Sequence, residues 1–156
     1  MRKIMAAAIV VCCSSIVGVP HATAQVGDTR QIQVTASVLG SCRFVSTLNL
    51  DFGSLDPANA VDKKQSVNVT FKCTKGVAYT FTVGNGLHAL SGTNRMKSAS
   101  VSDYVPYVID PKSLLGTGKG FGTSEAVTLT GTVKGTDYLD ATVGAYSDTV
   151  ILTIQP

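Results

Sequence analysis

The chain has 156 residues, 44% of them hydrophobic, and its 13 basic and 10 acidic side chains give a formal net charge of +3. Arg2 and Lys3 lie in an N-terminal segment that we expect to be removed, which leaves eleven basic residues against ten acidic ones. Because the remainder has no basic cluster, this balance argues against nucleic-acid binding.

The first 24 residues have the pattern of a signal peptide. A basic start is followed by an apolar run at residues 4–19 and by Ala22-Thr23-Ala24, a small-residue cleavage site. A transmembrane anchor is less favoured, because the run is shorter than the roughly 20 residues needed to span a bilayer. We therefore expect three segments: a signal peptide at 1–24, an N-terminal extension at 25–40 and one exported domain at 41–156.

Four cysteines are present, and Cys12 and Cys13 would leave with the signal peptide. The other two, Cys42 and Cys73, predict one disulfide in an exported chain. A metal site is disfavoured, because His88 is the only histidine of the mature chain. Closing a loop of about 30 residues is expected to stabilise the fold by roughly 3–4 kcal/mol.

The pattern of residues 31–39 predicts an amphipathic strand, which follows a polar tail at residues 25–30. Gln31, Gln33, Thr35 and Ser37 alternate with an apolar row made of Ile32, Val34, Ala36 and Val38. Such a terminal strand has two fates: it can pair within its own domain, or it can complete the sheet of another molecule.

Further alternating segments follow in chain order. We expect strands at 42–52, 66–73, 77–83, 103–110, 126–133 and 146–154, with a short strand at Arg95-Met96. In the predicted strands 42–52 and 146–154, the apolar residues expected to face inward are Phe44, Leu48, Leu50, Phe52, Val150, Leu152 and Ile154.

The connections between these segments complete the predicted topology. Lys75-Gly76 predicts a hairpin between 66–73 and 77–83, Pro106 confines its strand to an edge or a bulge, and 112–124 is expected to be a glycine-rich loop. Since no segment has a helical period with caps, the chain predicts an all-β antiparallel sandwich or barrel.

Catalytic chemistry has little support. The glycines of 116–122 lack phosphate-loop spacing, and Asn68-Val-Thr70 matches a glycosylation sequon on an expected outer strand face. His88 is expected to be a solvated loop residue, and Asp148 a turn or capping residue despite its inward parity. We therefore expect no enzyme activity, no cofactor or metal and no small-molecule substrate.

Several separated pieces resemble one family. Cys42-Arg-Phe-Val-Ser-Thr-Leu-Asn-Leu-Asp-Phe-Gly53, Val67-Asn-Val-Thr-Phe-Lys-Cys73 and Gly144-Ala-Tyr-Ser-Asp148 are similar in order and spacing to spore coat protein U domains. The usual tryptophan-glycine stretch is replaced by residues 115–122, and the proline-containing approach to the last strand is absent from 138–143.

Members of this family include subunits of archaic chaperone–usher pili. The resemblance implies an incomplete immunoglobulin-like β-sandwich that lacks its last strand, and the sequence fits this because no strand is expected after Ile154. It also implies that Ile32, Val34, Ala36 and Val38 form a donor strand for a neighbouring subunit.

The inward residues of the predicted strands 42–52 and 146–154 would then line the acceptor groove. The implied partners are related subunits, a periplasmic chaperone and an outer-membrane usher. A shaft subunit used in adhesion or biofilm is the first hypothesis. A non-fimbrial coat protein whose own strand completes its sheet is the second.

Overall fold

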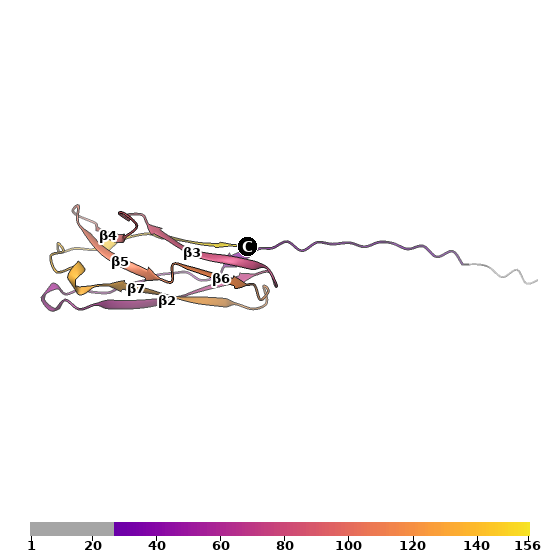
Figure 1. Cartoon of the computed structure of the whole chain (residues 1–156), viewed down its shortest axis with the longest axis horizontal. Helices are drawn as coiled ribbons and strands as arrows, with labels where there is room; N and C mark the ends of the chain where they lie inside the picture. The colour runs from indigo at the N-terminus through magenta and orange to yellow at the C-terminus, as the bar shows by residue number, and fades with distance from the viewer. Residues whose placement is uncertain (1–26) are drawn as a thin grey trace, which may run out of the picture. The chain divides into compact units, whose positions relative to one another are not determined.

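A computed structural model describes residues 27–156 of the chain (Figure 1). The predicted signal peptide at 1–24 therefore lies outside the described residues. Of the described residues, 27–36 belong to one unit and Ser37–Pro156 form another. Residues 27–36 contain neither helix nor strand. No helix within 27–156 is long and apolar enough to cross a membrane.

Residues 37–156 form two antiparallel sheets, and Figure 1 shows β2 and β7 on one side of the sandwich and β3 on the other. The larger sheet has the strand order β1-β2-β7-β5-β4-β8, and the smaller has β6-β3-β9. The strands are β1 (Cys42–Phe44), β2 (Lys63–Cys73), β3 (Ala78–Gly86), β4 (Asn94–Ser98), β5 (Tyr104–Asp110), β6 (Ser113–Thr117), β7 (Glu125–Val133), β8 (Tyr146–Ser147) and β9 (Val150–Gln155), with short 3-10 turns η1 (Pro57–Asn59) and η2 (Gly135–Asp137). This confirms the predicted all-β sandwich.

Aromatic rings fill the space between the two sheets. Phe71 of β2 stacks on Phe81 of β3 with ring centroids 6.2 Å apart, and Phe71 also meets Tyr79 edge-on at 5.2 Å. Phe71 and Phe81 are almost completely buried. Because truncation of such a ring costs about 3–5 kcal/mol, these contacts hold the sheets together.

The predicted hairpin between 66–73 and 77–83 is wrong. β2 pairs with β1 and β7, whereas β3 pairs with β6 and β9 in the other sheet. Both strands have an apolar row on one face, so the period-two pattern is satisfied equally when the rows face each other across the sandwich. The turn at Lys75-Gly76 therefore carries the chain from one sheet to the other.

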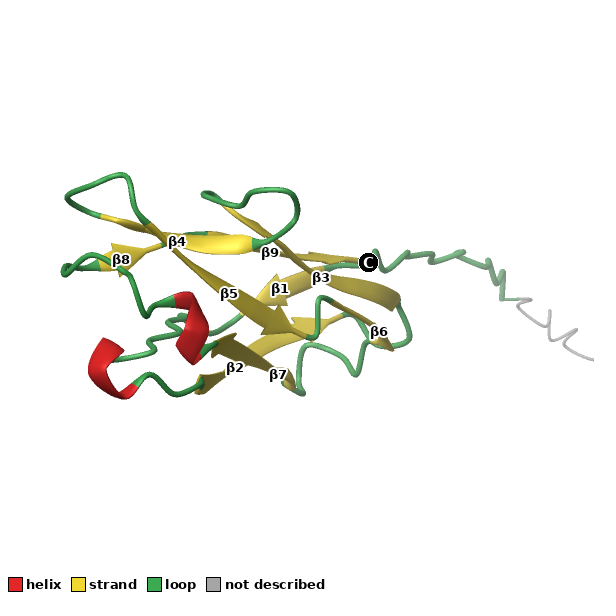
Figure 2. Ribbon diagram, turned by 60° about the vertical axis from the view of Figure 1, so that its left-hand side comes forward, coloured by secondary structure: helices red, strands yellow, loops and turns green. Residues whose placement is uncertain are grey.

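Three other predicted segments differ from the structure. The strand at 42–52 ends at Phe44, and residues 45–52 continue without regular pairing. The glycine-rich loop at 112–124 contains strand β6 at its start, paired with β3. The final strand at 146–154 is divided: β8 pairs with β4 in the larger sheet and β9 pairs with β3 in the smaller one (Figure 2).

Other expectations are met. Arg95-Met96 lies in β4, and the predicted strand at 126–133 is β7 with buried Val127 and Leu129. Pro106 pairs with Arg95 of β4, but the ladder between β5 and β7 starts only at Val108. Pro106 therefore lies in an interior strand rather than at the expected edge of the sheet, at a position that pairs with β4 but precedes the ladder to β7.

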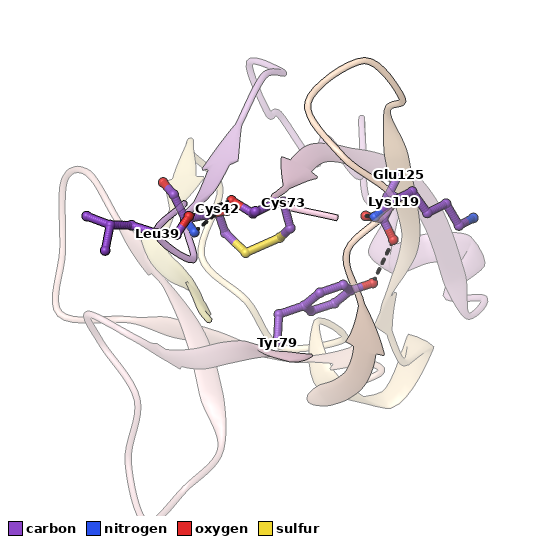
Figure 3. The surroundings of a disulfide bond; sticks show 8 residues. Leu39, Cys42, Cys73, Tyr79, Lys119 and Glu125 are labelled. Atoms are coloured by element: carbon purple, nitrogen blue, oxygen red, sulfur yellow. Dashed lines mark hydrogen bonds between the residues drawn. A yellow bond between two sulfur atoms is a disulfide. The ribbon is translucent and has the colours of Figure 1, made fainter. Parts of the chain in front are cut away.

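The predicted disulfide is confirmed. Cys42 and Cys73 are direct partners in the β1–β2 ladder, and their sulfur atoms are bonded at 2.05 Å (Figure 3). Cys73 is completely buried in the core. The bond therefore fastens the short β1 to the sheet, because β1 has only three residues of its own to pair.

Removing the disulfide should lower the free energy of unfolding by about 3–4 kcal/mol, because it closes a loop between residues 31 positions apart. Urea unfolding of the Cys42→Ala/Cys73→Ala variant measures the loss, and reduced wild-type chain is the matched comparison. A loss below about 1 kcal/mol in both samples would contradict this chain-entropy account.

Candidate functional site

The two sheets have four edge strands among residues 37–156: β1 and β8 in the larger sheet and β6 and β9 in the smaller one. Within residues 37–156, β9 pairs only with β3, and β1 pairs only with β2. β1 and β9 come within 8 Å between Cα atoms. Beyond Phe44 the chain leaves the regular ladder, and a cleft lined by both apolar and polar side chains lies between residues 48–52 and the start of β9.

The cleft has a volume of about 580 Å³. Its walls are formed by residues 48–52 on one side and 146–152 on the other, and its floor is apolar: Val67, Met96, Tyr107, Ile109 and Leu129. A second hollow of about 510 Å³ continues it and is lined by residues 50–55, 141–146 and Tyr138. The two hollows share Leu50, Asp51, Phe52, Met96 and Tyr146.

The structure brings five of the seven predicted groove residues to this cleft: Leu48, Leu50, Phe52, Val150 and Leu152. It places the other two elsewhere, because Phe44 packs edge-on against Phe81 with ring centroids 6.2 Å apart. Ile154, like Phe44, is partly buried against the core and lines neither hollow. That the cleft accepts a strand remains a prediction.

The predicted donor residues are strongly exposed. Ile32, Val34 and Val38 expose 87%, 88% and 86% of their surface, and Ala36 is exposed as well. Residues 31–39 form no strand in the single chain, which differs from the prediction. A strand requires a neighbour for its backbone hydrogen bonds, so the alternating pattern alone does not produce one.

A hydrogen-bonded clamp fixes the chain where this segment ends. The Thr74 hydroxyl donates to the Leu39 carbonyl and accepts from the Ser41 N–H, both at 3.1 Å. The Thr74 N–H also donates to the Ser41 carbonyl at 2.9 Å. Since Thr74 directly follows Cys73, clamp and disulfide together mark the start of the domain.

A buried carboxylate stands at the polar wall of the cleft. Asp148, whose side chain is only 2% exposed, lies at the point where the chain passes from β8 to β9. It accepts a hydrogen bond of 2.6 Å from the Tyr107 hydroxyl and bonds of 3.1 Å from the His88 N–H and ring. Any side chain at Gly86 would overlap this carboxylate.

These contacts shift the pKa values of Asp148 and Tyr107. Burial raises the pKa of Asp148, but hydrogen bonds from Tyr107 and from the backbone of His88 and Thr149 outweigh it, so the pKa is lowered from 3.8. Burial, followed by the Asp148 carboxylate, raises the pKa of Tyr107. The carboxylate is therefore held ionised as an acceptor of hydrogen bonds.

His88 is not the freely solvated residue that the sequence suggested, because its ring contacts Asp148 and its carbonyl accepts from Arg95. The pair resembles the histidine and carboxylate of a hydrolase. A nucleophile would complete it, but no hydroxyl forms a hydrogen bond with His88 among the described residues. Asp148 instead joins three segments of the fold, which is the capping role expected for it.

The loop that leads into β8 is held by a second carboxylate. Asp103 accepts from the Thr142 N–H and the Tyr146 hydroxyl, each at 2.7 Å. The hydrogen bonds from Thr142 and then Tyr146 lower the pKa of Asp103 to about 2. Because Tyr146 lines both hollows, this contact positions part of the cleft wall.

Two further polar anchors were missed by the sequence analysis. Tyr138 is buried, and its hydroxyl bonds both the N–H and the carbonyl of Val61, although it lies in a segment expected to be only a connection. Glu125 is buried beside Tyr79 and accepts from its hydroxyl at 3.2 Å and from the Lys119 N–H at 3.0 Å (Figure 3). Neither residue belongs to a motif that would have indicated it.

The sequence matches the model of the Spore Coat Protein U domain over residues 28–153. The chain belongs to this family. The match confirms the resemblance carried by the Cys42, Cys73 and Asp148 segments. No curated protein matches the sequence.

Among solved structures, the fold is similar to a chain of the CsuC–CsuE chaperone–tip adhesion subunit pre-assembly complex from archaic chaperone–usher Csu pili of Acinetobacter baumannii. The TM-score is 0.52 at 20% identity, over 76% of this chain and 40% of that chain. A chaperone–tip adhesin complex of CFA/I fimbriae matches with a TM-score of 0.41 at 14% identity, over 71% of this chain and 39% of that chain. The chain thus spans about two fifths of the length of either match, and its two sheets form an immunoglobulin-like sandwich.

Replacing Asp148 by Asn should destabilise the fold and flatten its response to acid. The amide presents N–H groups to donors that need an acceptor, at a cost of about 1–3 kcal/mol near neutral pH. Because the folded pKa lies below 3.8, the carboxylate stabilises the fold above that pH and loses this contribution as the pH falls through the folded pKa.

Urea unfolding between about pH 2 and 7 measures both effects. Exposed Asp140→Asn is the matched control, because it removes the same charge from a turn. An Asp148→Asn variant with the acid profile and stability of this control would contradict the role given to Asp148.

Proposed function

We propose that the protein is a structural subunit of an archaic chaperone–usher pilus that polymerises by donor-strand exchange. The observation that carries the proposal is the cleft with an apolar floor beside the unpaired edge of β9, together with an exposed, uncharged, alternating segment at 31–39 in the same chain. Membership of the Spore Coat Protein U domain family and the fold shared with a Csu pilus complex support it.

The cleft and the segment are complementary in chemistry. Val150 and Leu152 line the cleft, and β9 is an edge strand among residues 37–156, so an added strand would gain main-chain hydrogen bonds on its free side. Burial of Ile32, Val34 and Val38 would contribute roughly 1.5–3 kcal/mol each, or on the order of 5–9 kcal/mol together. Ala36 adds less.

Donation between molecules leads to a fibre. The donor segment and the acceptor cleft are different surfaces, so their contact is heterologous, and it propagates into an open fibre when the rotation between successive copies does not close a ring. Each subunit fills the cleft of one neighbour and offers its own cleft to another. Because a copy that both donates and accepts a strand can be followed by another copy, we assign this subunit to the shaft of the pilus.

Transit to the cell surface requires partners of two kinds. An open apolar cleft and a free strand edge invite aggregation, so we assign a periplasmic chaperone to cover them after export by the signal peptide at 1–24. An outer-membrane usher would then exchange the chaperone strand for the segment of the next subunit. The finished pilus would serve adhesion or biofilm formation at the cell surface.

Val34→Asp should abolish assembly, because it removes about 1.5–3 kcal/mol of apolar burial and places a charge in the cleft. The expected result is a loss of roughly ten-fold or more in multimers. The measurement is the size distribution of the full chain isolated from the periplasm. Gln33→Asp, which places the same charge on the opposite face of the strand, is the control and should assemble normally.

Three outcomes would overturn the proposal. Normal multimers from Val34→Asp would show that the segment does not enter a cleft. Equal loss from Gln33→Asp would show that charge alone is responsible. A stable wild-type monomer that unfolds when residues 27–40 are deleted would instead favour the coat-protein hypothesis, in which the strand completes its own sheet.

A further inference from the structure

The end of β3 contains a peptide bond that is prone to spontaneous chemical change. Asn85 is followed there by Gly86, and no other asparagine of the sequence precedes a glycine. Glycine has no Cβ atom to shield its backbone nitrogen, so this nitrogen can reach the side-chain carbonyl carbon of the preceding asparagine. Asparagine is a thermolabile residue. Loss of an amide group is therefore chemically easiest at Asn85.

The fold requires the glycine of this pair but not the asparagine. A Cβ atom on Gly86 would overlap the Asp148 carboxylate and would lie 3.0 Å from the Tyr107 hydroxyl, so no larger residue fits. Asn85 is exposed, and it lies where the ladder between β3 and β9 shifts its register, between Val83 and Gly86. The lability of the pair thus comes from the residue at position 85, whose side chain is open to water.

The closed fold keeps the Gly86 nitrogen unreactive. Its N–H donates to the side-chain oxygen of Asn94 in β4 at 3.0 Å, and Asn94 is only 2% exposed. The nitrogen attacks only after it has lost its proton, and a hydrogen bond from the N–H to a buried acceptor favours the protonated form. The Asp148 carboxylate beside Gly86 further opposes the negative charge that proton loss would create.

We propose that Asn85 is a modification site, converted to aspartate and isoaspartate when the contact between Gly86 and Asn94 opens. Asn94 is the residue that prevents this reaction in the closed fold. Opening of β3 from β4 frees the nitrogen from its acceptor and exposes it to solvent. The rate of the reaction then follows the population of the open form, as proteolysis and hydrogen exchange do.

The reaction consumes only water. The Gly86 nitrogen, once solvent has taken its proton, forms a bond to Cγ of Asn85. The bond from Cγ to Nδ2 breaks, and Nδ2 takes a proton from solvent and leaves as ammonia. The cyclic imide that results is then hydrolysed by water. Cleavage of the bond between Cγ and the nitrogen gives aspartate, and cleavage at the backbone carbonyl gives isoaspartate, in which the main chain runs through Cγ.

Isoaspartate at this position alters the polar wall of the cleft. It lengthens the backbone by a carbon atom just before Gly86. The next two residues donate from their backbone N–H groups, Leu87 to the Thr149 carbonyl at 2.9 Å and His88 to Asp148 at 3.1 Å. A longer backbone displaces both donors from their acceptors at the start of β9. A chain that has opened here is therefore marked by a change that closing does not reverse.

Peptide mapping by mass spectrometry measures the modification in the full chain, incubated in mildly alkaline buffer with and without denaturing urea. Asn85 should react in the denatured chain and at least about ten-fold more slowly in the folded one, a difference equivalent to about 1.4 kcal/mol. Asn49, Asn59 and Asn68 precede bulkier residues and are internal controls that should change little. An unmodified Asn85 in the denatured chain would overturn the site, and equal rates would overturn its protection by the fold.

Asn94→Ala should speed the modification of Asn85 in the folded chain about ten-fold or more, because it removes the acceptor of the Gly86 N–H. Tyr138→Phe is the matched control, since it removes a buried hydroxyl that bonds Val61 and leaves Gly86 untouched. The two variants are compared at equal stability, set with urea. Equal rates at equal stability would show that global unfolding controls the reaction and would overturn the role of Asn94.

Amide hydrogen exchange of the wild-type chain gives a measurement that needs no variant. The Gly86 N–H should exchange at least about ten-fold more slowly than the N–H of Gly122, which lies in an exposed turn. Exchange of both glycines at the same rate would mean that Asn94 does not hold the Gly86 nitrogen, and the proposed protection would be wrong.

Discussion

The structure depends on a gap between β9 and the residues that follow β1. Phe44 closes one end of this gap by packing on Phe81, but beyond it the chain at 45–52 does not rejoin the ladder and β9 keeps a free edge. The core beneath is consequently covered on only part of its length. Val150, Leu152 and Leu50 remain half-buried, which is an unstable arrangement for apolar side chains unless another strand covers them.

Polar contacts keep the gap in shape while it is open. Asp148 joins β5 and the loop after β3 to the start of β9, and Asp103 joins β8 to the loop before it. Both carboxylates have lowered pKa values, so they stay ionised as acceptors over the ordinary range of pH. At the end closed by Phe44, the Cys42–Cys73 disulfide and the hydrogen bonds of the Thr74 hydroxyl also hold the chain in place.

The period-two pattern predicted most strands and their inward faces, because burial of alternate residues is a local property. It failed where pairing partners matter. β2 and β3 were expected to pair, but apolar rows facing each other across a sandwich look the same in sequence as rows on one sheet. Likewise, nothing local indicated that Tyr138 and Glu125 would be buried, since their hydrogen-bond partners Val61 and Tyr79 lie far away in the chain.

The same reasoning explains why the segment at 31–39 has no strand partner in a single chain. Its sequence satisfies the side-chain requirement of a strand but supplies no neighbour, and β9 supplies a free edge without a strand to cover it. Each is a hazard alone, since exposed apolar rows and open edges both favour aggregation. Under the proposed function the two surfaces complete each other between copies, and because they are different surfaces an open chain of copies keeps one of each unpaired at its two ends. In the proposed fibre, each such contact would cover the apolar row of one copy and the free β9 edge of the next.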